Sequence, residues 1–260
     1  MWSVIASTFL FVAAASPAAA LKIDVTNEAD LPQPRIEELQ QQFTDWGARV
    51  YRYFGEAPDA PVKLVITKKA GPGFYVDDKI LIAPDDAEML ETWIHELTHH
   101  VTGHESSFFF KEGIATHVVE ALFAKEGRVP TGWPQYGQSN DAWVSLFLQR
   151  GAMQPLANAM AREGYEGFPP GEDFRSWQVY CIAGSFIGWL IATRGLDEFR
   201  RDFEEESLGD RAPALEAQWL ESIRKKNLAP FEPMKFLPDR ARYRSFARML
   251  KGSAREPASP

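Results

Sequence analysis

The chain has 260 residues, a formal net charge of −8 at pH 7 and a pI near 5.3. This length is enough for one large domain with a substantial core. Its 45% hydrophobic and 25% charged residues are ordinary for a globular protein. The acidic balance argues against a nucleic-acid-binding surface, and no apolar run after residue 20 is long enough to span a bilayer.

The first twenty residues differ from the rest of the chain. Residues 1–20 contain no charged side chain, and Ile5–Ala15 is a run of apolar or small residues. Ala18-Ala19-Ala20 matches the small-residue signal for leader cleavage. We therefore predict a secretory signal peptide at 1–20, a secreted or periplasmic mature chain starting at Leu21, and no stable membrane insertion after cleavage. An uncleaved membrane anchor is the alternative.

The elements up to residue 82 are predicted from periodicity and turn residues. Short strands are expected at 21–27 and 62–66, where β-branched residues alternate with polar ones in the second segment. A helix is expected at 36–54, since apolar residues recur there every three or four positions. Phe74–Val76 and Lys79–Ile82 flank Asp77-Asp78 and predict a hairpin or two short strands.

The segment His95-Glu96-Leu97-Thr98-His99 matches the H-E-x-x-H pattern of zinc hydrolases. In a helix expected from about 87 to 102, residues i and i+4 share a face, so His95 and His99 can each aim a ring nitrogen at one Zn²⁺. Glu96 lies close enough to take a proton from water activated by the metal. Trp93 and Leu97 lie on the opposite face and predict a half-buried helix.

A catalytic zinc site needs a third protein ligand. The pattern H-E-x-x-H-x-x-G-x-x-H is rejected, because Thr102 and Glu105 stand where Gly and His are required. A second template takes the third ligand from a glutamate on a later helix. Here Phe110-Lys111-Glu112-Gly113-Ile114-Ala115 follows, with Glu112 thirteen residues after His99.

The two segments together resemble the gluzincin metallopeptidases, the clan of thermolysin and aminopeptidase N. The resemblance implies that Glu112 is the third zinc ligand, and that a strand bordering the cleft, here within 73–82, pairs with the substrate backbone; a plain structural hairpin is the alternative. It also implies that Tyr180 donates its hydroxyl to the developing oxyanion, against the alternative of a core tyrosine. The Gly-x-Met-Glu-Asn segment of aminopeptidase relatives is absent at 71–86, which argues against aminopeptidase activity.

Other chemically active side chains receive different interpretations. His100 points about 100° away from His99 and is excluded as a ligand, whereas His104 and His117 are substitutes if Glu112 is not the third ligand. Glu120 is either a carboxylate that orients a ligand histidine or a solvated helix charge. Cys181 is the only cysteine, so there is no internal disulfide, and its apolar surroundings predict a buried thiol.

The later chain predicts mainly helices. They are expected from Glu112 to about 124, and at 141–149, 156–161, 174–193, 196–207, 214–226 and 240–250. Loops are expected at 128–140, a candidate cleft rim, and at 164–173. The aromatic run Phe108–Phe110 is expected to pack in the core rather than contact substrate.

We therefore expect one α+β domain of the zincin type at 21–250, with a disordered tail at 251–260. A small N-terminal sheet and the metal-binding helix precede a helical C-terminal part. The expected function is a zinc-dependent peptidase acting on a peptide or protein substrate, with His95, His99 and Glu112 as ligands and Glu96 and Tyr180 as catalytic residues. The alternatives are a catalytically silent zinc- or peptide-binding module of the cell envelope, and a chance motif that binds no zinc.

Overall fold

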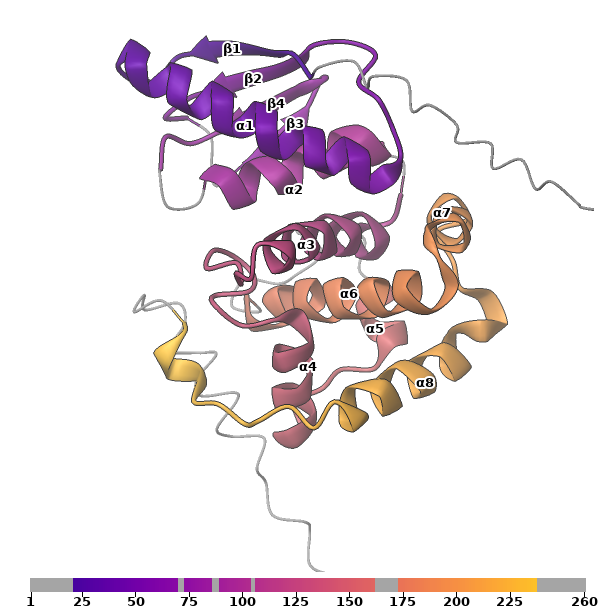
Figure 1. Cartoon of the computed structure of the whole chain (residues 1–260). Helices are drawn as coiled ribbons and strands as arrows, with labels where there is room; N and C mark the ends of the chain where they lie inside the picture. The colour runs from indigo at the N-terminus through magenta and orange to yellow at the C-terminus, as the bar shows by residue number, and fades with distance from the viewer. Residues whose placement is uncertain (1–20, 70–72, 86–88, 104–105, 162–172, 238–260) are drawn as a thin grey trace, which may run out of the picture.

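The computed structural model describes residues 21–69, 73–85, 89–103, 106–161 and 173–237. The predicted signal peptide at 1–20, most of the loop predicted at 164–173, the helix predicted at 240–250 and the tail at 251–260 lie outside these residues. The described residues form an N-terminal part, built of a sheet and two helices, and a helical C-terminal part (Figure 1). This arrangement confirms the α+β class.

The N-terminal part consists of β1 (Ile23–Asn27), α1 (Gln33–Phe54), β2 (Val62–Ile66), β3 (Phe74–Val76), β4 (Lys79–Ile82) and α2 (Met89–Thr102). The C-terminal part consists of α3 (Phe108–Lys125), α4 (Asn140–Gln149), α5 (Leu156–Met160), α6 (Asp173–Arg194), α7 (Leu196–Glu204) and α8 (Ala212–Lys225), with short 3₁₀ turns η2 (Gly209–Arg211) and η3 (Pro233–Lys235). We call them the sheet part and the helical part.

The sheet has the strand order β1-β2-β4-β3, in which β1, β2 and β4 are parallel and β3 is antiparallel to β4. Asp77 and Asp78 join β3 to β4 with φ values of 50° and 55°. Two central residues with positive φ are what a two-residue hairpin turn requires, and aspartate tolerates this conformation. The predicted hairpin is therefore confirmed, and β3 is an edge strand of the sheet.

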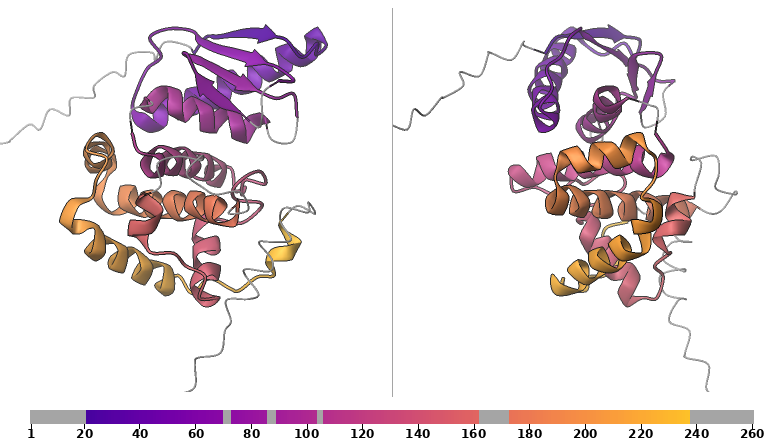
Figure 2. Two further views of the ribbon diagram at one scale, coloured as in Figure 1. Left: turned by 180° about the vertical axis from the view of Figure 1, so that it is seen from behind. Right: turned by 90° about the vertical axis from the view of Figure 1, so that its right-hand side faces the viewer.

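Helices α1 and α2 lie side by side against one face of the sheet (Figures 1 and 2). The Trp93 indole of α2 stacks on Phe43 of α1 and donates a hydrogen bond of 3.0 Å to the Phe43 carbonyl. Trp93 and Leu97 are fully buried, as their stripe predicted. The opposite face of α2 is thereby turned toward the helical part.

In the helical part, α3 and α6 pack along each other, and α3 lies between the sheet part and the remaining helices (Figure 1). Helix α3 begins at Phe108, so the expectation that Glu112 opens this helix is wrong. The aromatic run Phe108–Phe110 forms its first turn and is buried, which confirms its predicted place in the core. Glu112 therefore lies in the second turn, where the helix already passes α2.

Gly113 sets the distance between α3 and α6. A Cβ at this position would lie 2.9 Å from the Ala183 Cβ and 3.1 Å from its carbonyl carbon. Such contacts are shorter than packed atoms tolerate, so only glycine allows this approach. In the Glu112-Gly113 pair, the first residue belongs to the candidate site and the second allows α3 to pack closely against α6. Among the described helices, none is both long and apolar enough to cross a bilayer.

Candidate metal centre

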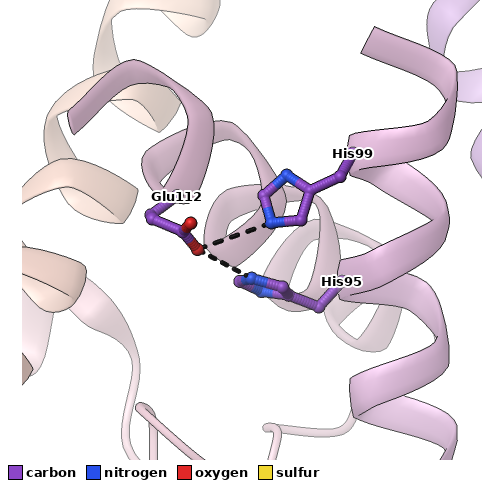
Figure 3. Close-up of side chains that lie close together, drawn as sticks. All are labelled: His95, His99 and Glu112. Carbon is purple, nitrogen blue, oxygen red and sulfur yellow. Dashed lines mark hydrogen bonds and ion pairs between the residues drawn. The ribbon is translucent and has the colours of Figure 1, made fainter. Parts of the chain in front are cut away.

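Two histidines of α2 and one glutamate of α3 meet where the two parts of the protein face each other. Nitrogen atoms of His95 and His99 and an oxygen of Glu112 all lie within 4.8 Å of one another. Figure 3 shows the two imidazoles on one helix and the carboxylate on the other pointing toward one another. The sequence prediction that these three side chains gather is confirmed as geometry.

The distances within this cluster suit a tetrahedral metal ion. Glu112 Oε2 lies 3.0 Å from His95 Nε2 and 3.5 Å from His99 Nε2. Two ligand atoms about 2.05 Å from an ion in tetrahedral geometry are roughly 3.3 Å apart. The donor set of two imidazoles and one carboxylate is also that of known catalytic zinc sites. These residues could hold a metal ion with little movement.

The electrostatics of the cluster depend on close pairing. Burial raises the pKa of the Glu112 carboxyl, but the charge of His99 and hydrogen bonds from His95 and His99 outweigh it, so the pKa lies well below its usual range. Burial lowers the pKa of His95, yet the hydrogen bond and charge of Glu112 raise it overall. The carboxylate is therefore ionised, as a metal ligand must be.

Glu96 lies beside this cluster on α2 and is only 7% exposed. The chain entering β3 passes directly over it: a Cβ at Gly73 would lie 3.4 Å from Glu96 Oε1 and 2.2 Å from Thr92 Cγ2. Gly73 is thus needed for close approach to α2. The edge strand β3 therefore starts next to the candidate general base.

Tyr180 of α6 lies next to the histidines. Its ring centroid is 6.4 Å from that of His95. Phe108 and Trp133 contact the Tyr180 ring edge to face, with centroid distances of 5.5 and 5.7 Å. The half-buried tyrosine is thus held within an aromatic surround at the edge of the cluster, rather than deep in the core.

The remaining histidines lie apart from the cluster. His100 Nδ1 is 3.3 Å from the Tyr75 hydroxyl, on the side of α2 that faces β3, in agreement with its exclusion as a ligand. His117 Nε2 pairs with the Tyr53 hydroxyl at 2.9 Å, and its ring packs against Gly188. The structure therefore does not bring His117 to the cluster. His104 lies outside the described residues.

Glu120 and Cys181 are explained by their packing and hydrogen bonds in the helical part. Glu120 accepts a hydrogen bond of 3.0 Å from the Asn140 backbone N–H, so it anchors the start of α4. Both sequence interpretations of this residue, a partner of a ligand histidine and a solvated charge, are wrong. Cys181 is fully buried, and burial raises the pKa of its thiol, which confirms the predicted inert thiol.

Three residues near the cluster escaped the sequence analysis. Lys111 Nζ lies 3.9 Å from Glu112 Oε1. Glu91, one helical turn before His95, binds the loop that carries Trp133. Lys111 directly precedes the predicted ligand Glu112 in the sequence, so its place near the cluster could have been predicted. For Glu91 and Trp133, the composition of the loop suggested a cleft rim but did not identify the contacting residues.

Comparison with known proteins adds no relative. No protein-family model matches the sequence, and no curated protein or solved structure is significantly similar to the chain.

Proposed function

We propose that this protein is a zinc-dependent peptidase of the zincin type, secreted or periplasmic. The observation that carries the proposal is the convergence of His95, His99 and Glu112, whose carboxylate lies 3.0 and 3.5 Å from the two imidazole nitrogens, with Glu96 adjacent to His95 on the same helix. A structural zinc site closes its fourth position with another protein ligand. Three ligands beside a buried carboxylate are what a site for activating water requires.

A zinc ion bound by these three residues would supply Lewis acidity and lower the pKa of a water molecule to about 7. Glu96 would accept the proton of the attacking water and pass it to the leaving amine. The Tyr180 ring lies beside His95, and its hydroxyl would donate a hydrogen bond to the oxyanion that develops on the substrate carbonyl.

The edge strand β3 supports a peptide as the substrate. No strand among the described residues pairs with its outer edge, and it starts beside Glu96. Its side chains Phe74 and Val76 are 52% and 44% exposed. An open strand edge with exposed apolar side chains can hold an extended peptide through main-chain hydrogen bonds.

The metal site is tested by the zinc content of purified residues 21–260. We expect about one zinc per chain in the wild type, and at least a hundredfold weaker binding in Glu112→Ala, because two imidazoles alone make an incomplete site. Glu126→Ala is the matched control, since Glu126 is a carboxylate on the same helical segment that pairs with Arg49 instead. Equal zinc in Glu112→Ala and wild type would reject Glu112 as a ligand.

The peptidase activity is tested with fluorescein-labelled casein and Glu96→Gln. We expect turnover to fall by a factor of about 10² to 10⁴, the contribution of a general base, while zinc content and fold remain. Zinc binding without turnover in the wild type toward casein and a mixed peptide library would favour the silent binding module. Full turnover in Glu96→Gln would remove Glu96 from the mechanism.

A further inference from the structure

The loop at 131–136 is held to α2 by a buried carboxylate. Glu91, which is 7% exposed, accepts a hydrogen bond of 2.7 Å from the Thr131 backbone N–H, and its other oxygen accepts one from the Gly132 N–H. Leaving buried hydrogen-bonding groups unpaired costs substantial free energy. Glu91 therefore attaches this loop firmly to the metal-binding helix.

The position of Glu91 on α2 relates this attachment to the metal site. Glu91 precedes His95 by four residues, and residues with this spacing lie on the same face of a helix. The loop is consequently bound one turn away from a candidate ligand. A shift of the loop would change the surroundings of His95.

The rest of the loop is bound to the helical part. The Trp177 indole donates to the Pro134 carbonyl at 2.7 Å, and the Trp143 indole donates to the Gln135 carbonyl at 2.6 Å. The Gln135 side chain donates to the Thr116 carbonyl of α3 at 3.1 Å. The loop thus bridges α2 to α3, α4 and α6, and Glu91 is its attachment to the sheet part.

Trp133 lies in the loop between the residues bound by Glu91 and those bound by the helical part, and it contacts Tyr180. It is half-buried and contacts the Tyr180 ring at a centroid distance of 5.7 Å and an interplanar angle of 75°. Phe108 contacts the same ring at 5.5 Å and 89°. Tyr180 is therefore bordered by two aromatic side chains while lying beside His95.

We propose that Glu91 is a positioning residue: through the 131–136 loop it holds Trp133 against Tyr180, and so fixes the Tyr180 ring beside His95. The effect on turnover rests on the proposed peptidase function, whereas the effect on the Tyr180 ring does not. A carboxylate is suited to this role because it accepts from two backbone N–H groups at once. An amide offers only one acceptor oxygen.

The first test observes the Tyr180 ring directly, in purified protein, with and without added zinc, that carries 3-fluorotyrosine at position 180. We expect one sharp fluorine resonance in the wild type, and a shifted or broadened one in Glu91→Ala and in Trp133→Ala. Trp133→Phe should keep a single resonance, because it keeps an aromatic edge. Glu216→Ala is the matched control: Glu216 also accepts a backbone N–H from a distant segment, that of Leu156, at 2.8 Å.

An unchanged fluorine resonance in folded Glu91→Ala or Trp133→Ala would overturn the proposal. This outcome is separate from a failure of the peptidase function, in which the wild type binds no zinc or cleaves nothing. Trp133→Ala leaves α2 intact, so the test remains decisive if Glu91→Ala does not fold.

The second test is a double-mutant cycle on fluorescein-casein cleavage. If Glu91 acts through Tyr180, Glu91→Gln should lower kcat/KM about tenfold, mainly in kcat. In a Tyr180→Phe background the same substitution should have almost no further effect. Equal losses in both backgrounds would contradict the proposed route, since a merely structural role would act on either enzyme alike.

Discussion

The sheet part and the helical part hold their sides of the metal centre in different ways. Helix α2 is amphipathic: Trp93 and Leu97 pack in the sheet part, and the opposite face presents His95 and His99. Helix α3 is apolar on nearly all sides, and Glu112 is one of its few buried polar side chains. The ligands of α2 are thus placed by the pattern of their own helix, whereas Glu112 is placed by what packs around α3.

The proposed zinc ion would therefore link the two parts, and its removal should have the largest effect. A ligand present at a thousandfold excess over its Kd stabilises the folded state by about 4 kcal/mol. For a chain of this size, we expect chelation to lower Tm by about 10 °C. Hydrogen exchange should increase most in α2 and α3. In Glu112→Ala the chelator should change nothing, while Glu126→Ala should respond like the wild type.

Two titratable residues of α3 allow the sheet part and the helical part to be compared through the pH dependence of stability. One residue contacts each part. His117 pairs with Tyr53 of α1, and burial lowers its pKa from 6.5 to about 4. Glu120 accepts the Asn140 N–H of α4, and burial raises its pKa from 4.5 to about 7, with Asp141 and Lys226 nearby. The two shifts have opposite consequences for stability.

The signs follow from which state binds more protons. Between pH 6.5 and 4 the unfolded chain protonates His117 but the folded protein does not, so this group lowers stability as pH falls. Between pH 4.5 and 7 the folded protein keeps the Glu120 proton and the unfolded chain loses it, so this group lowers stability as pH rises. Each term is about 3 kcal/mol over its window.

The free energy of unfolding of metal-free protein, measured by urea at pH 4.5 and pH 7, should show both terms. Glu120→Gln, which keeps an acceptor oxygen, should gain stability relative to wild type on going from pH 4.5 to 7. His117→Gln should show the opposite trend. A stability difference from wild type that is independent of pH in either variant would mean that the group titrates alike in both states.

The comparison also explains how far the sequence predicts this protein. The strands, α1 and α2 follow from alternation and helical spacing, since one face of each is exposed. The start of α3 was misjudged, because the apolar run before Glu112 has no polar face to mark a helix. Glu112 was predicted as a ligand from the resemblance of its segment to the gluzincins.

Glu91 and Trp133 lay beyond prediction for a different reason. The partners of Glu91 are the backbone N–H groups of Thr131 and Gly132, forty and forty-one positions along the chain. Every residue except proline has such a group, so no residue pattern marks the pairing. Contacts of this kind depend on the path of a loop, and that path is set by the packing of the whole helical part.

The smallest predicted effect concerns one glycine in each part. At Gly47 of α1, an added Cβ would meet the Leu21 Cδ2 at 2.3 Å and the Leu97 Cδ2 at 3.1 Å, which are the ends of flexible side chains. At Gly113 of α3 it would meet the Cβ and the carbonyl carbon of Ala183, which cannot move without moving α6. Alanine gains about 1 kcal/mol over glycine in helix propensity, while overpacking a core costs typically 1–3 kcal/mol.

We therefore expect Gly47→Ala to be nearly neutral and Gly113→Ala to lose about 1–2 kcal/mol in urea unfolding. Only Gly113→Ala should also weaken zinc binding, since it displaces the backbone that carries Glu112. Equal losses in both variants, with zinc affinity unchanged, would show that α3 can move relative to α6 without disturbing the carboxylate. The claim that packing around α3 positions Glu112 would then be wrong, and the bound metal itself would hold the carboxylate in place.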